Sequence, residues 1–141
     1  MKAVLITVTS IQRDENGQDS TIELVSPGKY YERNGVRYLL YEESELTGLE
    51  GVTTLIKLYP DYAVLVRMGK LKQRQTFKRG HRDETKYETP YGNLELTIET
   101  RELTDRLADG IGHIVIGYDV ALKGIWQSYN ELLIKVQEER H

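Results

Sequence analysis

The sequence predicts an all-β protein: a single antiparallel up-and-down (meander) β-barrel of about eight to ten strands with no substantial helix. Three observations favour this fold class. Apolar and polar residues alternate with a period of two along most of the chain. Turn signals such as Asn34-Gly35 and Pro60-Asp61 recur at short intervals between the alternating segments. No segment has the 3.6-residue periodicity of an amphipathic helix of useful length.

The first half of the chain predicts a series of hairpins. Residues 2–11 alternate, and Asn16-Gly17 after them predicts a type I′ hairpin turn. The segment Ser26-Pro27-Gly28 predicts a bulge or a bend, because proline and glycine both interrupt a regular strand. Asn34-Gly35 predicts a second hairpin. The further strands expected in this half cover residues 20–25, 29–33, 36–43, 52–59 and 62–68.

The second half predicts short strands and then long ones, at residues 73–78, 84–89, 93–103, 111–121 and 126–137. Residues 104–110 form the longest gap and are expected to hold one turn of helix at most. Thr89 to Gly92 suits a type I turn, with proline at its second position and glycine at its fourth. This turn brings Tyr87 and Tyr91 to one end of the barrel. There they either close the barrel or offer hydroxyl groups to a ligand.

The short connections predict that neighbouring strands pair in chain order, and closing such a sheet removes its exposed edges. A two-sheet sandwich is the alternative. The 141 residues correspond to one domain, residues 1–141. The chain has no cysteine, no apolar segment of membrane-spanning length and no recognisable signal peptide. We therefore expect no membrane association and a cytoplasmic location.

Three runs are apolar on both faces: Ala3–Thr7, Ala63–Val66 and Ile114–Ile116. One face fills the barrel, and the other must be covered by the chain itself or by a second subunit. This pattern predicts a possible homo-oligomer.

Arg67 is the ambiguous residue of the strand expected at 62–68. If Val64, Val66 and Met68 point inward, Arg67 lies on the outer face and pairs with a carboxylate such as Glu43 or Glu99. A bulge that inverts the register would instead place Arg67 inside the barrel as an anchor for an anion.

Positive charge is concentrated in residues 67–86, the basic hairpin. This segment has eight basic and two acidic residues, a net charge of +6, whereas the remainder has 11 basic and 20 acidic residues. Such a segment attracts anions or nucleic acid, or else it faces the acidic remainder of the protein. The candidate anion-binding residues are Lys70, Lys72, Arg74, Arg79 and His81. A single phenylalanine, Phe77, is not the series of aromatic rings that binds single strands, so we expect nucleic-acid binding less than the other functions.

Enzyme chemistry has no recognisable motif in the sequence. The three histidines, His81, His113 and His141, lack the spacing of a metal site, and no phosphate-binding loop or nucleophile elbow is present. The sequence therefore predicts no metal, no cofactor and no catalytic residue, and an enzyme stays the least favoured class.

Five segments in order, YLLYEE (38–43), TTLIKL (53–58), VLVRMG (64–69), YETPYG (87–92) and SYNELLI (128–134), resemble the YwiB-like family of small bacterial proteins. The resemblance implies a lipocalin-like meander barrel. It implies no activity and no catalytic residue.

Two functions from different classes follow from these observations. The first is binding of a small apolar or amphipathic ligand in the barrel, with Tyr87, Tyr91, Arg67, Tyr38 and Glu43 as candidate contacts. The alternative is an anion-binding, RNA-binding or protein-interaction module that uses the basic hairpin and encloses no ligand.

Overall fold

The computed structural model describes residues 1–139 and consists almost entirely of β-strands. The strands are β1 (Lys2–Arg13), β2 (Asp19–Arg33), β3 (Val36–Glu42), β4 (Val52–Leu58), β5 (Ala63–Gly69), β6 (Gln73–Phe77), β7 (Arg82–Thr89), β8 (Gly92–Ala108), β9 (Ile111–Leu122) and β10 (Ile125–Glu138). A 3-10 helix, η1 (Glu45–Thr47), is the only helical element within these residues. None of their helices combines the length and the apolar character that crossing a bilayer requires.

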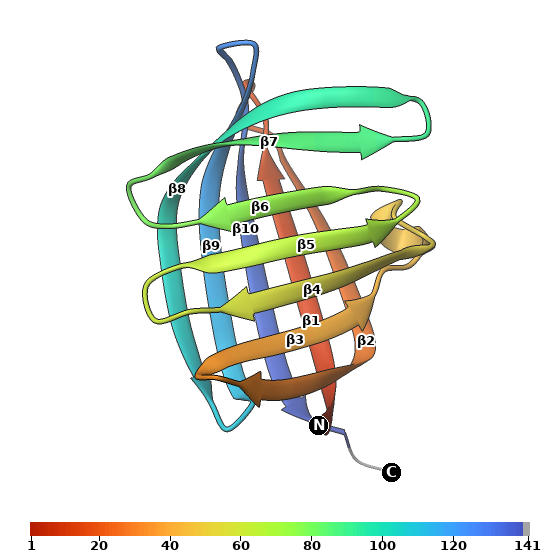
Figure 1. Cartoon of the computed structure of the whole chain (residues 1–141). Coiled ribbons are helices and arrows are strands. Elements are labelled where there is room, and N and C mark those ends of the chain that lie inside the picture. Colours follow the sequence, from red (N-terminus) through yellow and green to blue (C-terminus); the bar gives the residue numbers. More distant parts are fainter. Residues whose placement is uncertain (140–141) are drawn as a thin grey trace.

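The strands form one antiparallel sheet that curls into a nearly closed barrel. Their order is β6-β5-β4-β3-β2-β1-β10-β9-β8-β7. The first and last strands of the chain, β1 and β10, are therefore hydrogen-bonded neighbours. In Figure 1, β3 to β6 cross the front of the molecule, and β1, β8, β9 and β10 run steeply behind them. The predicted meander barrel is confirmed.

The barrel closes at the seam between β6 and β7, where side chains replace most of the backbone ladder. Backbone groups pair at one point, where Lys72 and Glu88 exchange two hydrogen bonds of 2.9 Å. Further along, the buried Thr85 hydroxyl donates to the Arg74 carbonyl at 2.7 Å. The Asp83 carboxylate accepts from the Thr76 N–H at 3.2 Å and from the Gln75 amide at 3.3 Å. Side chains of β7 therefore bind backbone N–H and carbonyl groups along the edge of β6.

We expect Asp83→Ala to lower the free energy of unfolding by about 2 kcal/mol, because it leaves a main-chain N–H at the seam without an acceptor. The matched control is Glu84→Ala, which removes the neighbouring exposed carboxylate and should change stability by less than about 0.5 kcal/mol. Urea unfolding followed by circular dichroism measures both. Equal stability of the two variants would mean that the side chain of Asp83 does not hold the seam.

Apolar side chains from nine strands fill most of the barrel interior. Those that are at most 3% exposed and belong to this core are Val4, Ile6, Leu39, Ile56, Leu58, Ala63, Leu65, Phe77, Ile98, Ile114, Ile116, Ile134 and Val136. The same core also contains Leu24 and Tyr30 of β2, Tyr41 of β3, and Val8, Leu107 and Leu132. The interior is therefore packed rather than open over most of its length.

The bend expected at Ser26 to Gly28 does not involve a bulge. β2 pairs with β1 in unbroken register from Asp19 to Tyr30. The glycine has a packing role instead, because a Cβ atom at Gly28 would lie 2.4 Å from Ile6 Cδ1 and 2.7 Å from the Leu40 carbonyl. Bulges occur elsewhere, in β8 between Thr100 and Glu102 and in β10 between Trp126 and Ser128.

Two turn predictions were wrong in detail. Residues 104–108 continue β8 instead of forming a gap, and Asp109-Gly110 makes a tight turn with both φ angles positive (52° and 80°). At Asn16-Gly17 only the glycine has a positive φ, so the turn is not type I′. The Asp14 carboxylate accepts from the N–H groups of Asn16 and Gln18 there and stabilises a longer turn. Asn34-Gly35 has two positive φ angles, as predicted.

Candidate functional site

Arg67 points into the barrel. It lies directly across from Thr54 of β4, which is fully buried, and antiparallel partners project to the same face of a sheet. The prediction that Val64, Val66 and Met68 point inward was therefore wrong, and Met68 is 40% exposed. No bulge is needed for this orientation. The first residues of this strand are apolar on both faces, so the alternation of residue types does not show which of them face inward. The pairing with β4 determines this.

The guanidinium group of Arg67 is only partly satisfied. One terminal nitrogen, Nη1, donates to Gln73 Oε1 at 2.9 Å, whereas the buried Nε–H has no partner within residues 1–139. Neither expected carboxylate forms an ion pair with Arg67, although Glu43 binds Thr54, the residue directly across from Arg67. Glu43 accepts from the Thr54 hydroxyl at 2.8 Å, and Glu99 lies 3.5 Å from Arg82. Arg67 therefore carries a positive charge into the barrel without an ion-pair partner among the described residues.

Buried polar side chains from several strands share the inner face of the barrel with Arg67. Tyr41 and Tyr118 are close enough for its charge to act on both phenols. Gln75 and Thr100 are each 1% exposed, and the oxygens Oε1 and Oγ1 of these side chains have no hydrogen-bond partner within the described chain. Unsatisfied buried polar groups are uncommon and require an explanation. We call these five residues, Arg67, Tyr41, Tyr118, Gln75 and Thr100, the polar cluster.

The two tyrosines of the polar cluster should ionise later than exposed tyrosines. Burial raises the pKa of Tyr41, with a further contribution from the Glu43 carboxylate, and burial also raises the pKa of Tyr118. Because the folded-state pKa values lie above the unfolded value of about 10, the stability they contribute is present below pH 10 and lost as pH rises above it. Tyrosinate absorbance at 295 nm measures this. In the double variant Tyr41→Phe/Tyr118→Phe, we expect two fewer tyrosines to ionise above the pH range of exposed tyrosines. If the number of tyrosines that ionise at high pH were unchanged, the prediction would be contradicted.

A pocket of about 460 Å³ opens next to the polar cluster, between the loop after β3, the β5–β6 turn and the tip of the β7–β8 hairpin. We call it the mouth pocket. Its buried apolar residues are Val52 and Leu71, which are 2% and 6% exposed. Tyr87, Tyr91 and Lys70 also line it. The structure therefore brings both predicted tyrosines together.

Tyr91 does not close the barrel, because its side chain is fully exposed. The turn that carries it is held by Thr89, whose hydroxyl donates to the Gly92 carbonyl at 2.7 Å and accepts from the Tyr91 N–H. Of the two roles considered for Tyr91, closing the barrel is therefore wrong. Tyr87 is half-buried and lies close to Tyr118.

The register of β4 and β5 places the mouth pocket directly above Arg67. Val52, which lines the pocket, pairs with Gly69, and the next inward-facing pair along the same strands is Thr54 with Arg67. On one face of a sheet, such successive pairs are neighbours. The mouth pocket and Arg67 are therefore neighbours along these two strands.

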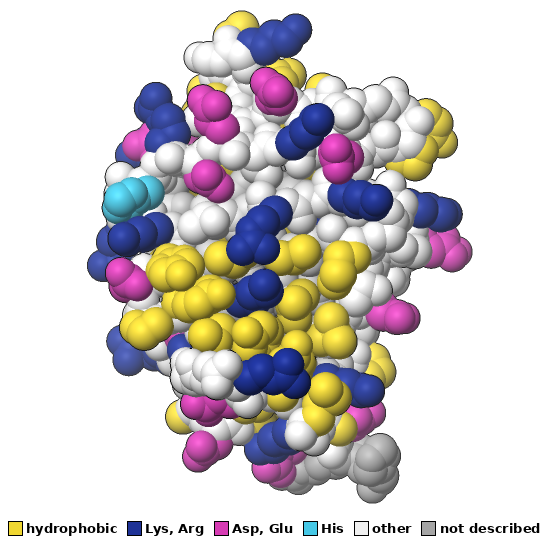
Figure 2. Space-filling model, viewed as in Figure 1, with side chains coloured by type: hydrophobic (Ala, Val, Ile, Leu, Met, Phe, Trp, Pro, Cys, Tyr) yellow, Lys and Arg dark blue, Asp and Glu magenta, His cyan; other side chains and the backbone are white. Residues whose placement is uncertain are grey.

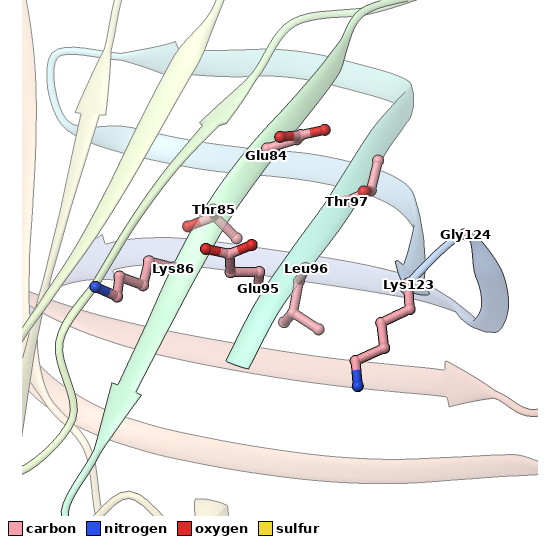
Figure 3. Close-up of a pocket in the computed structure, with 8 residues that line it drawn as sticks. All are labelled: Glu84, Thr85, Lys86, Glu95, Leu96, Thr97, Lys123 and Gly124. Atoms are coloured by element: carbon pink, nitrogen blue, oxygen red, sulfur yellow. The ribbon is translucent and has the colours of Figure 1, made fainter. Parts of the chain in front are cut away.

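A second pocket, of about 390 Å³, lies between the β7–β8 hairpin and the β9–β10 turn (Figure 3). Both charges surround it: Glu84 and Glu95 carry carboxylates, and Lys86 and Lys123 carry ammonium groups. Lys86 and Glu95 are cross-strand partners. This balance of charges does not select an anion or a cation, so the mouth pocket is the better candidate for a ligand site.

The other predicted residues are not brought together. Tyr38 lies on the outer face and stacks on Tyr31, with ring centroids 4.6 Å apart. Lys70, Lys72, Arg74, Arg79 and His81 are all exposed and follow the length of β6 rather than forming one patch. Three other basic residues of the hairpin have carboxylate partners: Lys78 with Asp61, Arg82 with Glu99 and Lys86 with Glu88. The basic hairpin therefore faces the acidic remainder in part.

Sequence reasoning missed an ion pair at the other end of the barrel. Arg37 binds the Asp105 carboxylate through both terminal nitrogens and also donates to the Leu107 carbonyl at 3.0 Å. Before the bulge at Thr100 and Glu102, the even-numbered residues of β8 face the barrel interior. After it the odd-numbered residues do, so Asp105 faces inward together with Leu107. The alternation of Arg37 with Leu39 and Tyr41 is the one signal that could have placed Arg37 inside.

The histidines do not form a metal site in the described part of the chain. His81 and His113 are exposed on different strands, and His141 lies outside the described residues. No group of three or more His, Asp or Glu side chains within residues 1–139 is arranged to hold a metal ion.

Comparisons with known proteins agree with the fold. A family model described as a domain of unknown function, DUF1934, matches residues 6–134. The uncharacterized beta-barrel protein YwiB of Bacillus subtilis (strain 168) is 31% identical over 117 residues, which are 83% of this chain and 80% of that protein. The crystal structure of the ywiB protein from Bacillus subtilis superposes with a TM-score of 0.82 at 26% identity, covering 96% of this chain and 92% of that chain.

Proposed function

The chain belongs to the DUF1934 family, a family of unknown function, and we propose that it binds a small amphipathic anion in the mouth pocket. The anionic group of the ligand accepts from the Nε–H of Arg67. Its apolar part lies against Val52, Leu71 and Tyr87. The observation that carries the proposal is the buried Nε–H of Arg67, a charged donor with no partner within residues 1–139.

Three physical points support an anion at this place. A charged group in a barrel interior is costly unless it is paired, so an ionic partner is worth more there than on the surface. Thr100 adds a buried hydroxyl that can donate to an anion and that has no partner within residues 1–139, whereas the unpartnered Gln75 Oε1 only accepts and would meet a donor group of the ligand. The mouth pocket, at about 460 Å³, is in the size range of sites for small molecules.

The composition of the pocket supports an amphipathic ligand rather than a fully apolar one. The apolar interior below Arg67 is filled by side chains such as Leu39, Ile56 and Phe77, which are at most 2% exposed. A fully apolar ligand deep in the barrel would have to displace them. A ligand with a polar end toward Arg67 and an apolar body at Tyr87 leaves these three core side chains in place.

Native mass spectrometry of the protein, incubated with a small-molecule extract of its host, tests the proposal. The wild type should retain a small anion that Arg67→Met loses, because methionine keeps much of the side-chain volume but removes the donor. Arg74→Met is the matched control, since Arg74 is exposed on the outer face of β6. Equal loading of Arg67→Met and wild type, or the absence of a bound compound from all three proteins, would contradict the proposal.

A further inference from the structure

The outer face of β3, β4 and β5 is apolar, although it lies outside the barrel. Leu40, Leu55 and Val66 form a continuous row across these strands, because Leu40 pairs with Leu55 and Leu55 pairs with Val66. Each of the three is half-buried by its neighbours on the sheet. In Figure 2 a hydrophobic area covers the front of the molecule over these strands. We call this row and the adjacent Tyr38 the outer patch.

The charges in the row and in the neighbouring row of Tyr38 are all positive, and Glu42, which follows Leu40 on the same face, lies at the margin in the other neighbouring row. Lys29 pairs with Leu40 at one end of the row, and Arg74 pairs with Val66 at the other. Lys57 lies between Tyr38 and Val64 in the neighbouring row. No carboxylate lies within 4.0 Å of these three cations in the described chain. Figure 2 shows Lys and Arg within the hydrophobic area and Asp and Glu at its margins.

From the combination of an apolar row with unpaired cations at both of its ends, we infer that the outer patch docks an acidic, amphipathic segment of a partner protein. The row spans four strand-to-strand steps of about 4.8 Å, or about 19 Å between Lys29 and Arg74. A helix of about 13 residues has this length. Its apolar side chains contact Leu40, Leu55 and Val66, and its carboxylates reach Lys29 and Arg74.

The same observations disfavour the other occupants of such a face. A two-fold interface between copies of this chain would bring Lys29, Lys57 and Arg74 of both copies to one surface. A nucleic acid would need free aromatic faces for its bases, but Tyr38 stacks on Tyr31 at 4.6 Å and the centre of the patch is aliphatic.

Site-specific photocrosslinking in host cells tests this inference. The photoreactive residue p-benzoyl-phenylalanine replaces Leu55 in the outer patch, or Val115 on the outer face of β9 as the matched control. Mass spectrometry of the crosslinked peptide identifies what is attached. The expected product is specific to position 55 and is a partner segment that contains both Asp or Glu and large apolar residues.

Charge reversal provides the second readout. Lys29→Glu/Lys57→Glu/Arg74→Glu should lower the crosslink yield from position 55 by about tenfold or more, since attraction at three pairs becomes repulsion. Circular dichroism verifies that the variant is folded. The inference would be overturned by a crosslink to a second copy of this chain, to RNA or to lipid. A yield that the reversal leaves unchanged, or no product beyond that at position 115, would overturn it as well.

Discussion

Phe77→Ala should lower the free energy of unfolding by about 4 kcal/mol, more than any other single truncation considered for this barrel. Phe77 is 2% exposed at the end of β6, and its ring centroid lies 4.9 Å from that of Tyr118. Truncation removes a large apolar side chain and leaves a cavity beside the seam. Because few backbone hydrogen bonds join β6 to β7, the seam has little else to hold it.

Urea unfolding followed by circular dichroism measures this change. Phe77→Leu, which keeps most of the apolar volume, should lower stability by only about 1 kcal/mol. Leu94→Ala is a control for loss of apolar surface alone, since Leu94 is 48% exposed. If Phe77→Ala were no more destabilising than Leu94→Ala, the packing between β6 and β9 would not hold the barrel closed.

Asp105→Ala should lower the free energy of unfolding by about 3 kcal/mol, because it leaves the partly buried guanidinium of Arg37 without its anion. Both side chains of this pair are 23% exposed. The carboxylate also accepts from the Leu107 N–H at 3.1 Å, so its removal leaves a main-chain donor unsatisfied as well. In this variant Arg37 keeps its hydrogen bond to the Leu107 carbonyl, which is 3.0 Å long in the wild type.

The double variant Arg37→Leu/Asp105→Leu separates the ion pair from the site that holds it. Replacing both partners with apolar side chains is often nearly neutral, so the double variant should be more stable than Asp105→Ala. Thermal or urea unfolding of the wild type, Arg37→Leu, Asp105→Leu and the double variant gives the coupling free energy. A double variant less stable than both single variants would mean that the charges are needed for the barrel end to form.

The strands could be predicted from the sequence because their alternation is local. Asn34-Gly35 gave the correct turn because asparagine and glycine both tolerate positive φ. Asp109-Gly110 has the same property but lies in a polar segment that does not alternate clearly, and the gap predicted there is in fact strand. At Asn16-Gly17 the dipeptide signal was overridden by Asp14, whose carboxylate binds two N–H groups of the turn.

The candidate site was harder to predict because it depends on the phase of individual strands. The run Ala63–Val66 is apolar on both faces, so Arg67 fits either side of the sheet, and only its pairing with Thr54 turns it inward. Asp105 faces the barrel interior because of a bulge earlier in β8, and no pattern of residues predicts that bulge. The position of Tyr87 and Tyr91 at one end of the barrel could be predicted, because Pro90 and Gly92 indicate a turn between them.

The Nε–H of Arg67 lies inside the barrel without a partner in residues 1–139, and the proposed function requires that an amphipathic anion binds it. The most direct test is the ¹⁵N-edited NMR spectrum of the arginine side chains during titration with decanoate, with Arg67→Lys used to assign the Arg67 signal. We expect the Arg67 Nε–H resonance to shift saturably while that of the exposed Arg74 stays unchanged. An Arg67 resonance that does not move, whether or not the exposed arginines respond, would contradict the account.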